Sequence, residues 1–252
     1  MCYDMSYFSS IKLISDYLQL QEENQFDFSP TYHQVAQTFA PWPVAVNEEG
    51  IKIKIFEWGL IADYMNTAEK IKQYRSSMAN ARSEKMLDDP KSVWHRLRQQ
   101  RCLVFCNGFF EHRDMGAKKK QPYFIRMKDE ALCCIAGLYN YAPVPDPATG
   151  ELIGSFSILT RSANTMMQKI HNGGEHSGRM PLLLNRELAL RWLEKTISDQ
   201  DLRNICDYAM PVDNMIAWPV NSIRKRKEDN EEVIKPINLL FDEIRGEEKK
   251  VK

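Results

Sequence analysis

The sequence contains no long hydrophobic run: nowhere in its 252 residues do the roughly 20 consecutive apolar residues of a membrane span occur. Glycine (11 residues) and proline (12 residues) are too scarce for a low-complexity chain. Net charge is also lacking, because 34 Lys and Arg balance 34 Asp and Glu, and this argues against a histone-like binder that depends on overall positive charge. We therefore expect a soluble globular protein with no membrane partner.

The six cysteines lack the paired CxxC spacing of a zinc site, and no second His or Cys cluster accompanies them. The first residues lack the basic and apolar segments of a signal peptide. We therefore expect a cytoplasmic protein with reduced, buried thiols and with neither a metal ion nor another cofactor.

Short periodic segments fill most of the chain. Helical patterns cover residues 8–21, 67–78, 186–195 and 199–208, and Asp89-Pro90 predicts the start of a helix that ends near Gln100. Apolar and polar residues alternate over residues 51–58, which predicts a half-exposed strand. Further strand-like runs occupy residues 101–110, 122–127, 131–141, 153–162 and 179–184.

Hairpin-length connections separate the central strand-like runs, so a mainly antiparallel sheet is expected. Strands with interspersed helices and no strict β-α-β alternation indicate an α+β fold. We expect one domain over residues 2–245, followed by a disordered tail over residues 246–252, which are rich in Lys and Glu.

Cys2 is the first candidate for chemistry. Loss of Met1 would leave a residue with an α-amino group and a thiol on adjacent carbons. Such a residue condenses with an aldehyde to a Schiff base, and the thiol then closes a durable thiazolidine ring. An α-amine with a pKa of about 7.7 to 8.0 is partly neutral near pH 7. Taken alone, Cys2 is also compatible with an accident of the start site.

Two further candidate sites lie at the ends of predicted helices or strands. Asn80 and Arg82 lie just after a predicted helix, where an amide can orient a nucleophile and a guanidinium can bind a phosphate. Glu111 follows Phe109 and Phe110 at the end of an apolar run, where a desolvated carboxyl group has a raised pKa and suits general acid catalysis. The alternatives are a surface loop for the first pair and a solvated strand-edge carboxylate for Glu111.

His171 lies between an apolar run and a glycine-containing loop, a setting that suits an acid–base group. Packing is the alternative role. The other histidines lack this setting and are interpreted as surface or packing residues: His33, His95, His112 and His176.

Taken together in order, these motifs resemble those of the SOS response-associated peptidase (SRAP) family of abasic site processing proteins. The resemblance runs through Met1-Cys2, Trp58-Gly59-Leu60-Ile61, Asn80-Ala81-Arg82-Ser83-Glu84, Cys102-Leu103-Val104, Gly108-Phe109-Phe110-Glu111, Ile158-Leu159-Thr160, Ile170-His171, Arg179-Met180-Pro181 and Trp218-Pro219-Val220-Asn221. It implies a single α+β domain around a mainly antiparallel, barrel-like sheet that binds single-stranded DNA and crosslinks covalently to abasic sites.

The resemblance also implies roles for individual residues. Cys2 would be the nucleophile after removal of Met1 by self-processing or by an aminopeptidase, and Asn80 would orient its amine and the sugar. Glu111 would shuttle protons as the sugar opens, and His171 would assist the Schiff-base chemistry, including β-elimination or reversal. The residues expected to contact DNA are Arg82, Arg179, Trp58 and Tyr64.

This chain departs from the family pattern at three places. Tyr3-Asp4 replaces the Gly-Arg that commonly follows the cysteine, so we expect Asp4 to repel a phosphate. Ala62-Asp63-Tyr64 replaces a Pro and Trp, although Tyr64 is still able to stack on a base. The loop between His171 and Arg179 is long, which leaves His176 as an alternative to His171.

Three functions remain open at this point. The first is a monomeric abasic site processing protein that protects the lesion through a Cys2 crosslink. The second is an autoproteolytic peptidase acting on Met1 or on peptides, and the third is a noncovalent reader of single-stranded DNA. Because net charge is zero, the DNA interpretation predicts that Arg82, Arg179 and nearby cations share one face, with the acids elsewhere.

Overall fold

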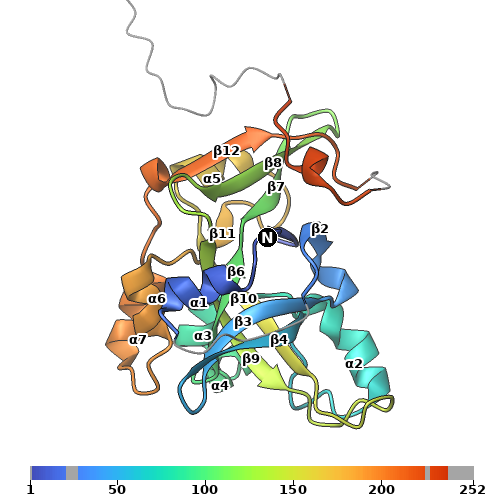
Figure 1. Ribbon diagram of the computed structural model, residues 1–252, viewed down its shortest axis with the longest axis vertical. Helices are drawn as coiled ribbons and strands as arrows, with labels where there is room; N and C mark the ends of the chain where they lie inside the picture. The colour runs from blue at the N-terminus through green and yellow to red at the C-terminus, as the bar shows by residue number, and fades with distance from the viewer. Residues whose placement is uncertain (1, 21–27, 225–227, 238–252) are drawn as a thin grey trace, which may run out of the picture.

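The structure is a computed structural model that describes residues 2–20, 28–224 and 228–237, and it contains two β-sheets with short helices around them (Figure 1). The first sheet has five antiparallel strands. Their order is β12 (Met215–Pro219), β8 (Lys120–Met127), β7 (Gly108–Asp114), β1 (Asp4–Tyr7) and β2 (Thr31–Val35). The predicted α+β class is confirmed.

The second sheet has seven strands, in the order β11 (Arg179–Pro181), β10 (Gly154–Ser162), β4 (Ile51–Trp58), β3 (Pro41–Asn47), β6 (Arg101–Cys106) and β9 (Cys133–Tyr141), with β5 (Asn80–Arg82) beside β10. Because β9 also pairs with β10, the strands β10, β4, β3, β6 and β9 are joined in a ring. Only two residue pairs join β10 to β4, and they are parallel, so this is a partial ring and not a regular barrel.

The described part of the chain has seven short α-helices outside the sheets. They are α1 (Lys12–Leu18), α2 (Ala68–Tyr74), α3 (Ser83–Asp88), α4 (Val93–Arg96), α5 (Thr165–Ile170), α6 (Arg186–Trp192) and α7 (Asp199–Cys206). Single 3₁₀ turns are η1 (Ala36–Thr38), η2 (Arg75–Ser77), η3 (Val212–Asn214) and η4 (Glu231–Val233). No helix in the described ranges has the length and apolar character needed to cross a bilayer.

The predicted elements are largely confirmed, and the strand over residues 51–58 has the predicted bounds as β4. The single run predicted over residues 101–110 is wrong, because Asn107 divides it into β6 and β7, which belong to different sheets. The predicted tail, residues 246–252, lies outside the described residues.

Two helices begin later than predicted, for local reasons. Phe8 does not enter α1, because its ring stacks on Tyr32 with 4.9 Å between centroids and its backbone N–H donates to Asn107. The helix expected from Asp89 begins at Val93 as α4, capped by Ser92, whose hydroxyl accepts from the Trp94 N–H. Asp89 instead accepts a hydrogen bond from the Lys91 N–H in the preceding turn.

Asn107 joins the N-terminal segment to the point where the two sheets meet. Its Oδ1 accepts from the backbone N–H groups of Phe8 and Ser9, at 2.8 and 3.1 Å. Its Nδ2 donates to Ser9 Oγ and to the Ala131 carbonyl, at 2.6 and 2.9 Å. The next residue, Gly108, has no room for a side chain, because an added Cβ would lie 2.3 Å from Phe124.

We expect Asn107→Ala to lower the free energy of unfolding by roughly 2–4 kcal/mol, since each of its four hydrogen bonds contributes roughly 0.5–1.5 kcal/mol net. Urea denaturation measures this loss. Asn204→Ala, in which an exposed amide bonded to Gln200 is removed, is the control and should change stability by less than about 0.5 kcal/mol. Equal effects of the two substitutions would contradict a structural role for Asn107.

Candidate active site

Cys2 lies two residues before the start of β1, which is paired on both edges. Asp4 lies opposite Phe110 of β7 on one side and Val35 of β2 on the other. Cys2 and all four residues of β1 are buried. Two hydrogen-bonded neighbours therefore hold the start of the chain at an interior position, where a terminus would otherwise fray.

The Cys2 side chain is buried, with 1% of the residue exposed, and its Sγ lies 3.7 Å from the Asp4 carbonyl oxygen. Burial raises the pKa of the thiol well above its ordinary value, and the negative charges of Glu111 and Asp4 act in the same direction. The sulfur is therefore a neutral thiol near pH 7. The half-buried Tyr3 belongs to the same environment, since burial and then Cys2 and Glu111 raise the pKa of its phenol.

Glu111 and His171 form the acid–base part of the site. Glu111 is 8% exposed, and burial raises the pKa of its carboxyl group. Its Oε2 lies 3.9 Å from His171 Nδ1, and its Oε1 accepts from the His112 backbone N–H at 3.0 Å. Two groups that the sequence predicts to take part in proton transfer thus lie close together.

His171 ends α5, and its ring is oriented by Arg179. Nδ1 lies 2.9 Å from the Arg179 carbonyl oxygen, which only accepts hydrogen bonds, so the neutral ring carries its proton on Nδ1 and has its acceptor at Nε2. Burial lowers the pKa of the imidazole. The ring is therefore neutral near pH 7 and able to take up a proton.

Arg179 has a different environment from the exposed phosphate contact that the sequence predicts. It is 7% exposed, and its guanidinium donates to both oxygens of Glu84, at 2.5 and 2.9 Å, and to the Thr160 carbonyl at 2.7 Å. Arg82 is half-exposed and has Nε 3.9 Å from Glu84. The carboxylate of Glu84 thus lies near both arginines, and the backbone carbonyl of Arg179 orients the ring of His171.

Asn80 begins β5, which pairs in parallel with β10, so that Asn80 lies opposite Ile158. The residue is 8% exposed, and among the described residues neither its amide nitrogen nor its amide oxygen has a hydrogen-bond partner. Leaving such groups unpaired costs roughly 1–3 kcal/mol each. An amide held in this state is poised to bind a polar group from outside the chain.

The two aromatic residues predicted to contact DNA differ. Trp58 is fully buried, and its indole N–H donates to the Ala79 carbonyl at 3.0 Å, so the prediction of a DNA contact for this ring is wrong. Tyr64 is 42% exposed and packs edge to face against Tyr74, which is 40% exposed. The exposed aromatic surface therefore has two rings, and the second was missed because Tyr74 lies inside a helical pattern.

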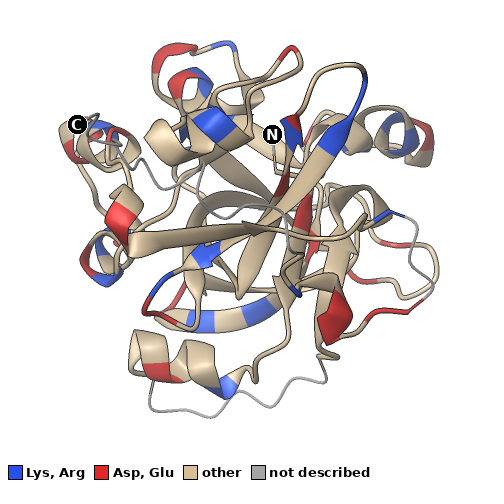
Figure 2. Cartoon of the chain, turned by 90° about the horizontal axis from the view of Figure 1, so that it is seen from above, with Lys and Arg blue, Asp and Glu red and all other residues tan. Residues whose placement is uncertain are grey.

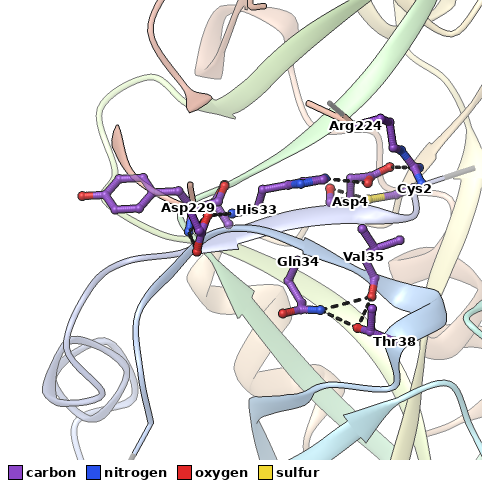
Figure 3. Close-up of polar contacts among 10 residues, drawn as sticks. Cys2, Asp4, His33, Gln34, Val35, Thr38, Arg224 and Asp229 are labelled. Atoms are coloured by element: carbon purple, nitrogen blue, oxygen red, sulfur yellow. Dashed lines mark hydrogen bonds and ion pairs between the residues drawn. The ribbon is translucent and has the colours of Figure 1, made fainter. Parts of the chain in front are cut away.

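Asp4 was expected to repel phosphate, and the structure corrects this. Its carboxylate is buried, with His33 Nε2 2.8 Å from Oδ1 and Arg224 Nη2 2.8 Å from Oδ2. Figure 3 shows His33 and Arg224 on either side of the carboxylate, with the sulfur of Cys2 beside them. Paired and buried in this way, Asp4 presents no negative face to solvent, and the missed residues are His33 and Arg224.

Charge is not segregated over the molecule as its zero net charge led us to predict. Figure 2 shows basic and acidic segments interspersed around the chain. Surface pairs such as Arg203 with Asp88, at 2.7 Å, account for part of this mixing. Attraction of a polyanion to this protein therefore depends on individual cations near the site and not on a basic face.

Metal-assisted chemistry has no ready ligand set, since no group of three or more His, Cys, Asp or Glu in the described part of the chain is arranged to hold a metal ion.

Comparison with known proteins identifies relatives of this chain. The chain is 31% identical over 173 residues to abasic site processing protein YoqW of Bacillus subtilis, which covers 69% of this chain and 71% of that protein. It is 24% identical over 230 residues to abasic site processing protein HMCES of Xenopus tropicalis, covering 81% of this chain and 64% of that protein.

A crystal structure of a protein from Bacteroides thetaiotaomicron superposes with a TM-score of 0.79 at 26% identity, covering 94% of this chain and all of that one. Residues 1–224 match the family described as SOS response associated peptidase (SRAP). The match includes Cys2, Asn80, Glu111 and His171. The chain therefore belongs to the SOS response-associated peptidase family.

Proposed function

We propose that this protein processes abasic sites by capturing the sugar aldehyde in single-stranded DNA through Cys2, once Met1 has been removed. The observation that carries the proposal is the placement of Cys2 beside a buried acid–base pair, Glu111 and His171. The relatives' names, abasic site processing protein, support the choice of substrate. The covalent product would shield the lesion from strand cleavage.

The chemistry needs an acid, an amine and a thiol in sequence. An abasic deoxyribose is mostly a closed hemiacetal, and protonation of its ring oxygen with loss of the hydroxyl proton opens it to the aldehyde. The Cys2 nitrogen attacks the aldehyde carbon, and loss of one water gives the imine. The Cys2 sulfur then adds to the imine carbon, and the thiol proton passes to nitrogen, which closes the thiazolidine.

Burial equips the neighbouring groups for these proton transfers. A raised pKa increases the fraction of Glu111 that is protonated at a given pH, which favours a role as general acid. The neutral His171 ring accepts protons at Nε2 during the Schiff-base steps, including reversal or β-elimination. A neutral Cys2 thiol carries the proton that the last step transfers to nitrogen.

Substrate binding uses the groups around this centre. The unpartnered amide of Asn80 would orient the sugar and the attacking amine. Arg82, which is half-exposed, would contact a phosphate, while Arg179 would act mainly by holding His171 and Glu84. A base next to the lesion would stack on Tyr64 and Tyr74.

Self-cleavage of the Met1–Cys2 bond is a second candidate activity. It is favoured by the same observation, since Glu111 and His171 lie beside the residue that follows the scissile bond. A noncovalent reader of single strands is the remaining alternative, and it would leave the buried acid–base pair without a role.

The crosslink is tested by incubating the protein with an abasic oligonucleotide and separating the products on a denaturing gel. We expect a shifted band for the wild type and none for Cys2→Ala. Because Cys2→Ala keeps an α-amine after loss of Met1, it should give a band only when cyanoborohydride reduces the imine. A heat-stable band from Cys2→Ala without reductant would exclude the thiazolidine.

We expect Glu111→Gln to slow crosslinking at least about 100-fold, the lower range for a general acid, with little loss of affinity for a tetrahydrofuran analogue that cannot open. The wild-type rate should fall as pH rises through the raised pKa of Glu111, because its acid form is lost, and Glu111→Gln should lack this limb. Glu187→Gln, on the exposed surface of α6, is the control. If Glu111→Gln lost crosslinking rate and affinity for the analogue to the same extent, the result would argue against proton transfer by Glu111.

Self-processing predicts that Met1 is lost from the wild type when methionine aminopeptidase is inhibited during cell-free synthesis. Glu111→Ala should retain Met1 under the same conditions, and Glu187→Ala should lose it. Intact-mass spectrometry reports the difference. Retention of Met1 in the inhibited wild type would assign its removal to the aminopeptidase.

A further inference from the structure

We propose that Arg224, held in place by the buried carboxylate of Asp4, is a phosphate-binding residue beside Cys2. The proposal rests on the proposed function, because the phosphate is one that flanks the captured sugar in single-stranded DNA. Arg224 is the last described residue before residue 228, and it lies 220 positions after Asp4 in the chain. The fold alone brings them together.

The carboxylate of Asp4 holds two side chains in place. Its side chain is 4% exposed, and each of its oxygens is used, Oδ1 by His33 and Oδ2 by Arg224. A carboxylate removed from water in this way needs such partners, because an uncompensated buried charge is costly. Arg224 is therefore fixed in position by a group that the fold itself holds rigidly in β1.

The two partners of Asp4, His33 and Arg224, differ in exposure, and this difference points to a ligand for Arg224. His33 is 14% exposed, whereas the Arg224 side chain is 52% exposed. A guanidinium has five N–H donors, and the hydrogen bond described for Arg224 uses one nitrogen, toward Asp4. The remaining donors lie on the exposed part of a side chain whose orientation is already set, which reduces the entropy lost on binding an anion.

The location is next to the reactive atoms. Cys2 Sγ lies 3.7 Å from the carbonyl oxygen of the same Asp4 whose carboxylate binds Arg224, and Figure 3 shows Arg224 extending past Cys2. Burial lowers the pKa of His112, the charge of Asp4 opposes this, and the positive charges of Arg224 and Lys120 act with burial. Arg224 thus lies within electrostatic range of His112, the residue that follows Glu111.

The other arginines of the site do not duplicate this arrangement. Arg179 is buried and bonded to Glu84 and Thr160, so its guanidinium faces inward. Arg82 is exposed, and its Nε lies 3.9 Å from Glu84. Because the molecule has no basic face, the pre-oriented guanidinium of Arg224 would decide how a DNA strand is positioned for attack by Cys2.

The test is the salt dependence of noncovalent binding. Full-length wild type, Arg224→Gln and Arg191→Gln are titrated with a single-stranded oligonucleotide containing a tetrahydrofuran residue, at several salt concentrations. Arg191 is the matched control: its side chain is 42% exposed and bonded to Asp201 at 2.8 Å, but it lies on α6. Loss of one phosphate contact should reduce the slope of log K against log salt by about 0.7 for Arg224→Gln.

Arg191→Gln should leave the wild-type slope unchanged. Equal slopes for wild type and Arg224→Gln would overturn the proposal, and so would equal reductions in the two variants. If Arg224→Gln does not fold, Arg224→Lys takes its place: it should keep the slope and bind more weakly at every salt concentration, because an ammonium lacks the two-pronged geometry. Unchanged affinity in Arg224→Lys would then overturn it.

Failure of the proposed function gives a different pattern. A wild type that binds the oligonucleotide but never crosslinks an authentic abasic site contradicts the Cys2 chemistry alone. The salt slopes still report on Arg224 in that case. Conversely, a normal crosslink with no change of slope in Arg224→Gln contradicts the role of Arg224 and leaves the Cys2 chemistry intact.

Discussion

The pairing of β1 on both of its edges is the constraint on which the rest of the site depends. A nucleophile at residue 2 has almost no chain before it, so its position is set entirely by the strand on its C-terminal side. Hydrogen bonds to β7 and β2 hold that strand, and Asn107 ties the chain that leaves it to the junction of the two sheets. The strand therefore holds Cys2, near the start of the chain, at a buried position.

Burial sets the protonation states that the proposed chemistry needs. The same exclusion of water raises the pKa of Cys2 and of Glu111 and lowers that of His171, because in each case it disfavours the charged form. Glu111 Oε2 lies 3.9 Å from His171 Nδ1, and Glu111 is near enough to Cys2 for its charge to raise the pKa of the thiol. The catalytic arrangement thus follows from packing as much as from the identities of the residues.

Carboxylates organise the cations of this protein. Glu84 holds Arg179 and lies near Arg82, while Asp4 holds Arg224 and His33. Each ion pair neutralises the charge of an arginine locally but holds its guanidinium in one orientation. A chain with 34 basic and 34 acidic residues therefore presents oriented guanidinium groups without a basic face. Affinity for undamaged strands would be low, and retention at a lesion would come from the covalent bond.

The sequence by itself determined the class of fold, the bounds of β4, and the ordered motifs that identify the family, because these depend on local periodicity and on residue types in series. Only the tertiary structure decided that Trp58 is buried, that Arg179 faces Glu84, and that Asp4 carries Arg224. The physical reason is that burial and charge pairing depend on contacts between distant positions, 84 with 179 and 4 with 224. No local pattern records such contacts.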